Sequence, residues 1–169
     1  PDNDAMGVRV FGSAPELAAR LGAALVEGLQ GEGVLATAKH FPGHGDTRLD
    51  SHLAAPVINA SREVLMEREL APFRAAARAG AAAVMTCHAY YPALDPANVA
   101  THSAPILRDL LRGELGFGGL VVTDALDMSG VGDMPGLERA RRAVEAGADL
   151  AMLGHLPDQG DLVARLSSY

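Results

Sequence analysis

The segment KHFPGHGDTRLDSH, from Lys39 to His52, holds the densest group of chemically capable side chains in this sequence. It contains three histidines, two aspartates and a lysine, together with three glycine or proline residues that favour a loop. Ionisable residues usually lie singly on a protein surface, whereas a site that moves protons or binds a polar ligand needs several that converge. The segment therefore predicts a functional loop.

These side chains suit two kinds of chemistry. An imidazole titrates near pH ~6.5 and can exchange protons around neutrality. Asp50 and His52 would project to the same side of an extended segment, where the carboxylate could orient the ring. Alternatively, the segment supplies nitrogen and oxygen ligands for Zn²⁺ in a metal-dependent hydrolase, namely His40, His44, Asp46, Asp50 and His52. A phosphate-binding loop is excluded, because PGHGDT lacks the glycine spacing and the following Lys-Ser/Thr.

Short apolar runs alternate with longer amphipathic ones, which is typical of βα units around a parallel sheet. In the first expected helix leucine recurs every four residues, with Ser13 as the expected cap and Pro15 in the first turn. The expected strands, rich in Val, Ala, Leu and Met, are 33–39, 82–87, 120–123 and 149–153. The expected helices are 15–30, 61–79, 104–115, 136–146 and 158–166.

Polar side chains follow each expected strand at its carboxyl end. In order along the chain they are Lys39 and His40, Cys87 and His88, Thr123 and Asp124, and His155. Sites in parallel α/β folds are assembled at this edge of the sheet. Four strands cannot close a barrel, and a half-barrel leaves strand edges unpaired. We therefore expect an α/β fold that is a piece of a larger barrel, with parallel strands alternating with helices.

Composition excludes several classes of protein. The chain has 169 residues, of which 49% are hydrophobic, enough for a packed core. A net charge of −7 leaves no basic surface for nucleic acid, and no apolar stretch is long enough to span a membrane. The lone Cys87 excludes an internal disulfide and is expected to be a buried thiol. A cytoplasmic location is the first expectation, and a secreted or cell-envelope one is the alternative, because the chain opens on Pro1 without a Met.

Three motifs, in this order, carry a family resemblance: GVRVFG, KHFPGHGDTRLDSH and VVTDALDM. Together they resemble glycoside hydrolase family 3, and within it the β-N-acetylglucosaminidase (β-hexosaminidase) branch of the peptidoglycan-recycling type. The Asp-Ser-His ending of the loop separates this branch from the family's β-glucosidases. The resemblance covers residues 1–169 and implies the C-terminal portion of a catalytic (β/α)8 TIM-type barrel, with its first strands missing from the chain. It also implies a retaining exo-hydrolase that removes terminal β-linked N-acetylglucosamine from peptidoglycan fragments or related glycans.

The resemblance also implies a role for individual residues. Asp124 would be the nucleophile that forms a covalent glycosyl-enzyme, His52 the acid and then the base, and Asp50 its orienter. The expected sugar-binding residues are Lys39, His40, Arg9, His88 and Met128. No cofactor or metal is implied, and the partner is a carbohydrate.

Some alternatives remain open from sequence alone. Asp127, three residues after Asp124, is the rival nucleophile, although a turn or helix-start role is commoner at such a position. His102 and His155 belong to no motif and are expected at the surface or rim. A truncated barrel that binds sugar without turnover is the non-enzymatic alternative. The sequence does not determine the oligomeric state. It also does not determine whether water or phosphate attacks the glycosyl-enzyme.

Overall fold

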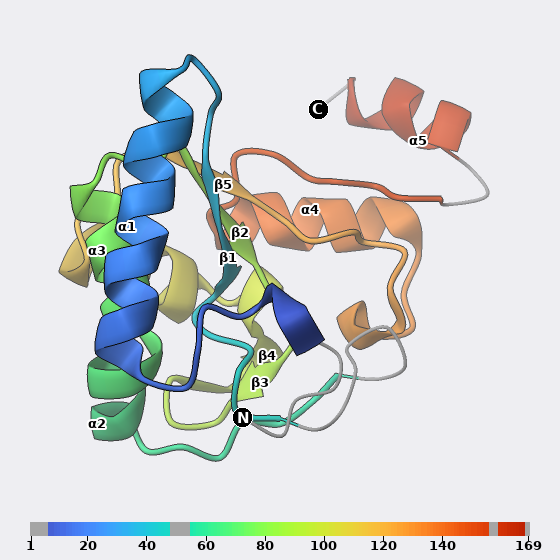
Figure 1. The fold of residues 1–169 in the computed structure, drawn as a ribbon. Helices are drawn as coiled ribbons and strands as arrows, with labels where there is room; N and C mark the ends of the chain where they lie inside the picture. Colours follow the sequence, from blue (N-terminus) through green and yellow to red (C-terminus); the bar gives the residue numbers. More distant parts are fainter. Residues whose placement is uncertain (1–6, 48–54, 156–158, 168–169) are drawn as a thin grey trace.

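A short parallel sheet organises the protein. The computed structural model describes residues 7–47, 55–155 and 159–167 (Figure 1). Its parallel strands lie in the order β1 (Thr37–Phe41), β2 (Ala83–Thr86) and β5 (Leu120–Val122). The fourth expected strand is present only as a parallel bridge between Val122 and Leu150. The predicted α/β class, with parallel strands alternating with helices, is confirmed.

Helices lie on both sides of the sheet. Helix α1 (Pro15–Gly31) packs against α3 (Ala71–Arg78), and α4 (Gly136–Ala146) runs beside the segment that follows β5 (Figure 1). The predicted helices 15–30 and 136–146 are confirmed almost to the residue. Ser13 as a cap is wrong, because Ala14 occupies that position and makes no side-chain cap. Among the described residues, no helix has the length and apolar character to cross a bilayer.

Two helical segments are wound more loosely than an α-helix. The Leu70 amide donates to the Leu65 carbonyl (3.0 Å) and Leu115 to Leu110 (2.9 Å), both five residues back. The Val64 amide donates to the Ser61 hydroxyl (3.3 Å). Ser61 therefore caps the first helical segment where the sequence predicted a helix to begin. The first loosely wound segment is η2 (Leu65–Glu69), which continues α2 (Arg62–Val64), and the second is η4 (Pro105–Glu114). The last helix is α5 (Gln159–Leu166).

The first strand begins later than predicted. The expected strand was 33–39, but pairing with β2 starts at Thr37, opposite Ala83. Val34 and Leu35 precede it with 52% and 75% of their surface exposed. The register with β2 shifts between Lys39 and Phe41, where the Lys39–His40 and Phe41–Pro42 peptide bonds are cis. His40 lies near the carboxyl end of β1.

The core lies between the sheet and its covering helices. Phe41 is fully buried and meets the Phe73 ring of α3 edge-on, with ring centres 5.2 Å apart. Val84 and Val121 continue the buried layer along β2 and β5. Cys87 is buried, and burial raises the pKa of its thiol to about 12, which confirms the expected unreactive thiol.

A hairpin that the sequence did not predict follows β2. Strands β3 (Tyr90–Tyr91) and β4 (Asp95–Val99) pair antiparallel. The buried Asp95 carboxylate accepts from the Ala97 amide (2.9 Å) and from the Ser103 hydroxyl (2.7 Å). The Ser103 oxygen in turn accepts from the Ile106 amide at the start of η4 (3.3 Å). Asp95 therefore ties the hairpin to the helix.

Replacing Asp95 with asparagine is expected to lower the free energy of unfolding by about 2 kcal/mol near neutral pH, because an amide nitrogen cannot accept the Ser103 proton. Burial alone would raise the pKa of Asp95, but hydrogen bonds from Ser103, Asn98 and backbone amides outweigh it and lower the pKa. Such a group stabilises the fold above its unfolded pKa of about 3.9, and the contribution is lost as the pH falls through the folded value.

Urea denaturation over a pH series measures this effect. The difference between wild type and Asp95→Asn should stay constant from neutral pH down to about pH 5 and shrink below about pH 4. A difference that persists unchanged at the acid end would show that the carboxylate charge is not what stabilises the hairpin.

Candidate active site

Two of the predicted site residues meet above the carboxyl ends of the strands. His40 is the next-to-last residue of β1 and Asp124 follows β5, and these strands flank β2 in the sheet. The His40 Nε2 atom lies 3.5 Å from Asp124 Oδ2. The histidine side chain is 9% exposed and the aspartate side chain 20%, so the carboxylate is the more accessible of the two. Segments 84 residues apart in sequence thus form one site, as predicted from their places after the strands.

His40 is neutral at physiological pH. Burial lowers its pKa to about 4, and the positive charges of Lys39 and Arg9 act in the same direction, while Asp124 opposes them. The contact with Asp124 is therefore not an ion pair near neutrality. Among the described residues, the buried His40 Nδ1 has no hydrogen-bond partner. A ligand hydroxyl could fill that position.

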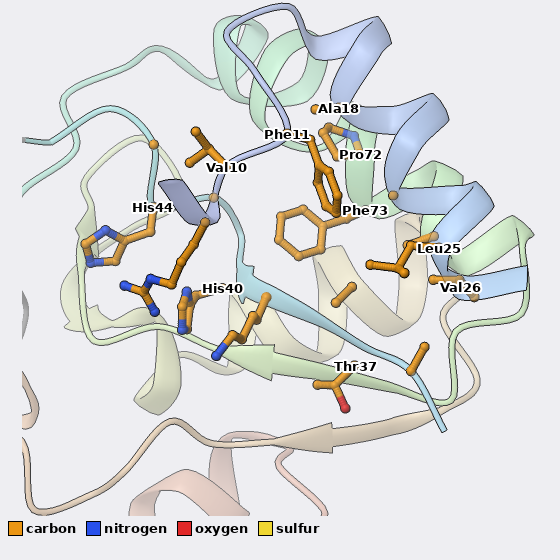
Figure 2. A pocket seen from close by; sticks show the side chains of 18 of the residues that line it. Val10, Phe11, Ala18, Leu25, Val26, Thr37, His40, His44, Pro72 and Phe73 are labelled. Carbon is orange, nitrogen blue, oxygen red and sulfur yellow. The ribbon is translucent and has the colours of Figure 1, made fainter. Parts of the chain in front are cut away.

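A cavity of about 380 Å³ opens beside His40 (Figure 2). Its polar lining includes Arg9, Lys39, His40 and His44, and His40 and His44 lie at one end (Figure 2). The His44 ring lies edge-on to the His40 ring at 6.2 Å between centres. At the other end Phe11, Leu25, Val26 and Phe73 give it an apolar lining (Figure 2). Three residues expected to bind sugar, Arg9, Lys39 and His40, therefore line one cavity.

A second hollow, of about 370 Å³, lies directly at Asp124. Met128, expected to line the pocket, is one of its lining residues. The Ala125 amide donates to Asp124 Oδ1 (2.8 Å), which fixes one oxygen of the carboxylate while the other faces His40. These contacts hold the Asp124 carboxylate between the segment that follows β5 and His40 of β1.

Asp127 ties two loops together. Its Oδ2 accepts from the His155 amide (2.9 Å). Gly154 packs against the same carboxylate so closely that an added Cβ would lie 2.0 Å from Asp127 Oδ1. Gly154 also has a φ of +65°, which favours glycine. These contacts support the turn role for Asp127 over that of nucleophile.

Two histidines lie deeper than expected. His88 was expected to bind sugar, but it is fully buried with both ring nitrogens hydrogen-bonded, to Thr101 Oγ1 (2.8 Å) and to the Ala125 carbonyl (3.0 Å). It borders neither hollow described above, so a direct sugar contact is not what this arrangement provides. His102 was expected at the surface, yet it is only 9% exposed and its Nε2 donates to the Arg139 carbonyl (3.0 Å).

The second half of the predicted loop, with Asp50 and His52, lies outside the described residues. The first half is anchored by residues that the sequence did not single out. The buried Tyr91 hydroxyl donates to the Gly43 carbonyl (2.7 Å), and Arg68 pairs with Asp46 (2.6 Å). Tyr91 and Arg68 belong to no motif near the loop, so no local signal could have identified them.

The Zn²⁺ hypothesis is not tested by this structure. In the part of the chain that the structure describes, no group of three His, Cys, Asp or Glu side chains could hold a metal ion. Two of the five proposed ligands, Asp50 and His52, lie outside that part.

Comparison with known proteins identifies the family. The family model for the glycosyl hydrolase family 3 N terminal domain matches residues 1–165. The chain belongs to this family. It is 42% identical over 157 residues to a β-hexosaminidase of Neisseria meningitidis serogroup C (strain 053442), covering 92% of this chain and 43% of that protein. It is 39% identical over 166 residues to β-hexosaminidase A of Pseudoalteromonas piscicida, covering 90% of the chain and 28% of that protein.

A solved family 3 structure has the same fold. The β-N-acetylglucosaminidase of Paenibacillus sp. str. FPU-7 superposes with a TM-score of 0.93 and 48% identity, covering 100% of this chain and 33% of that one. The fold and the resemblance noted from the motifs are thus confirmed. The chain spans less than half the length of these family 3 relatives.

Proposed function

We propose that the protein containing this chain is a retaining exo-β-N-acetylglucosaminidase, acting on terminal β-linked N-acetylglucosamine in peptidoglycan fragments or related glycans. The observation that carries the proposal is the placement of Asp124: a partly exposed carboxylate at the end of β5, 3.5 Å from a neutral His40. Family 3 relatives named β-hexosaminidase and β-N-acetylglucosaminidase support the choice of sugar.

In the first step Asp124 attacks the anomeric carbon while the bond to the leaving-group oxygen breaks. His52, oriented by Asp50, gives its proton to that oxygen. The transition state carries positive charge on the sugar, which a negative carboxylate stabilises best when no cation neutralises it. The neutral state of His40 preserves that charge on Asp124.

In the second step water attacks the same carbon from the opposite face. His52 now accepts the proton of the water, and the bond to Asp124 breaks. Because each displacement inverts the anomeric carbon, the product keeps the β configuration. A histidine suits both halves, since an unperturbed imidazole with a pKa near ~6.5 both donates and accepts around neutrality.

The binding roles fall to the polar end of the cavity beside His40. Lys39 and Arg9 supply charged donors for sugar hydroxyls, and His40 Nδ1 is a buried acceptor. Met128 gives the hollow at Asp124 an apolar wall against which a sugar face can lie. These groups position the substrate and take no part in bond making.

Trapping the covalent intermediate tests the proposal. A 5-fluoro-N-acetylglucosaminyl fluoride should glycosylate the full-length protein, because the ring fluorine slows both steps while the good fluoride leaving group restores the rate of the first, so that the glycosyl-enzyme accumulates. Peptide mass spectrometry is expected to place the sugar on Asp124. A label on Asp127, or steady turnover of an aryl glycoside with an α-configured first product, would overturn the assignment.

The metal alternative predicts a different result. If a bound Zn²⁺ activated water, EDTA dialysis would abolish turnover and no sugar would become attached to the protein. Under the proposal, EDTA leaves both the turnover of an aryl N-acetylglucosaminide and the labelling of Asp124 unchanged.

A further inference from the structure

His88 lies directly behind the segment that carries Asp124. It follows β2 and is completely buried. Its Nε2 lies 3.0 Å from the Ala125 carbonyl, and because a carbonyl can only accept, this nitrogen carries the proton. Burial lowers the pKa of His88 to about 4, so the ring is neutral and Nδ1 is an acceptor at physiological pH.

Two threonines fix this state of the ring. The Thr101 hydroxyl lies 2.8 Å from His88 Nδ1 and is the donor that the neutral ring requires. Thr101 Oγ1 is also 2.7 Å from Thr86 Oγ1, which can donate to it. The Cys87 carbonyl, 3.0 Å from Thr101 Oγ1, competes with His88 Nδ1 for the single hydroxyl proton, but it already accepts from the Thr101 amide (3.2 Å). All of these groups are buried, and the orientation of the imidazole is therefore determined by protein contacts alone.

Ala125 connects this buried histidine to the nucleophile. Its carbonyl accepts from His88, and its amide donates to Asp124 Oδ1 (2.8 Å). The opposite side of the same segment is bonded to residues 150–152: the Thr123 amide to the Leu150 carbonyl (2.9 Å) and the Leu126 amide to the Met152 carbonyl (2.8 Å). His88 supplies the contact on the side facing β2.

We propose that His88 is a positioning residue that sets the orientation of the Asp124 carboxylate through the peptide of Ala125, without touching the sugar. The proposal rests on the proposed function, in which Asp124 attacks the anomeric carbon. Without the His88 donor, the Ala125 carbonyl keeps only the weaker contact from the Met128 amide (3.2 Å), and the peptide that holds Asp124 loses its connection to the segment after β2. A displacement of the attacking oxygen of about 1 Å costs on the order of 100-fold in rate.

Two substitutions at His88 separate its two hydrogen bonds. Glutamine can place an amide N–H near the position of Nε2, and so keeps the donor to Ala125. Asparagine reaches only the position of Nδ1, and so keeps the acceptor for Thr101 and loses the donor. For turnover of an aryl N-acetylglucosaminide by the full-length protein, we expect kcat of His88→Asn to fall about 10-fold to 100-fold, and that of His88→Gln about 3-fold or less. KM should stay near the wild-type value for both.

His102 offers a matched control. It is buried, and its Nε2 donates to a backbone carbonyl at 3.0 Å, but that carbonyl belongs to Arg139 in α4. His102→Gln and His102→Asn should show the same loss of thermal stability as the His88 pair, without a difference in kcat between them. A purely structural role for His88 predicts that its pair behaves in the same way as the His102 pair.

Labelling by the 5-fluoro sugar distinguishes the outcomes. A wild-type protein labelled on Asp124, with slower labelling in His88→Asn than in His88→Gln, supports the proposal. Equal labelling rates in the two variants, or a raised KM with unchanged kcat, overturn it. Failure of the wild type to be labelled on Asp124 refutes the proposed function instead. If His88→Asn does not fold, Thr101→Val removes the donor that fixes the ring; a kcat fall of about 3-fold or more at unchanged KM is expected, and an unchanged kcat refutes the proposal.

Discussion

Replacing Asp124 with alanine is expected to lower kcat on β-linked N-acetylglucosaminides by about four to six orders of magnitude, since losses of this size follow removal of a catalytic nucleophile. The side chain is 20% exposed at the end of β5, so its removal leaves no large cavity and the protein should fold normally. KM should change far less than kcat, because the binding side chains at the polar end of the cavity remain. Circular dichroism and thermal melting establish the fold, and an aryl glycoside assay measures the loss.

A rescue experiment makes this result specific. Azide is small enough to take the place of the missing carboxylate, and it would attack the anomeric carbon from the face that Asp124 occupied. A single displacement inverts that carbon, so Asp124→Ala with azide and an activated substrate should yield the α-glycosyl azide. Asp127→Asn is the matched control: its amide oxygen can still accept from the His155 amide, and kcat should fall less than about 10-fold. A loss of activity in Asp127→Asn equal to that in Asp124→Ala would indicate that Asp127 is the nucleophile and that Asp124 is not.

Local patterns in the sequence predicted the helices better than the strands. The four-residue spacing of leucines fixed α1, since a helix satisfies its own backbone hydrogen bonds. A strand begins where its partner begins, and Val34 and Leu35 read as strand residues although β2 offers them no partner. The β3–β4 hairpin was missed for a related reason: Asp95, Pro96 and Asn98 are residue types that are rare in strands, whereas the Ser103 hydroxyl that binds the Asp95 carboxylate comes from outside the hairpin.

The candidate site was predictable as far as strand ends and motifs could locate it. His40 and Asp124 lie together because the carboxyl ends of parallel strands share one edge of the sheet. The deep burial of His88 and His102 was not predictable, because it depends on Thr101 and Arg139 meeting them in space. A buried histidine with both nitrogens occupied looks the same in sequence as one that faces a ligand.

Removing the imidazole of His52 is expected to produce a loss that depends on the leaving group. In His52→Ala, kcat/KM should fall about 100-fold to 10,000-fold for alkyl and sugar aglycones, because these alkoxides cannot depart without a proton. For nitrophenyl-type aglycones, which depart as stable anions, the fall in kcat/KM should stay below about 10-fold. A series of aryl glycosides of graded phenol acidity measures the slope of log kcat/KM against leaving-group pKa. His155→Ala, which removes an exposed histidine, should leave that slope unchanged.

Azide also separates the role of His52 from that of Asp124. In His52→Ala the covalent intermediate still forms with an activated aglycone, but water attacks it slowly because no base accepts its proton. Azide needs no base, so it should raise kcat and give the β-glycosyl azide, the product of two inversions. Asp124→Ala gives the α-glycosyl azide instead, because the anomeric carbon of the substrate is inverted only once. Equal falls in kcat/KM for all leaving groups, or an α-azide from His52→Ala, would remove His52 from the role of acid and base and leave Asp124 to act with a different proton donor.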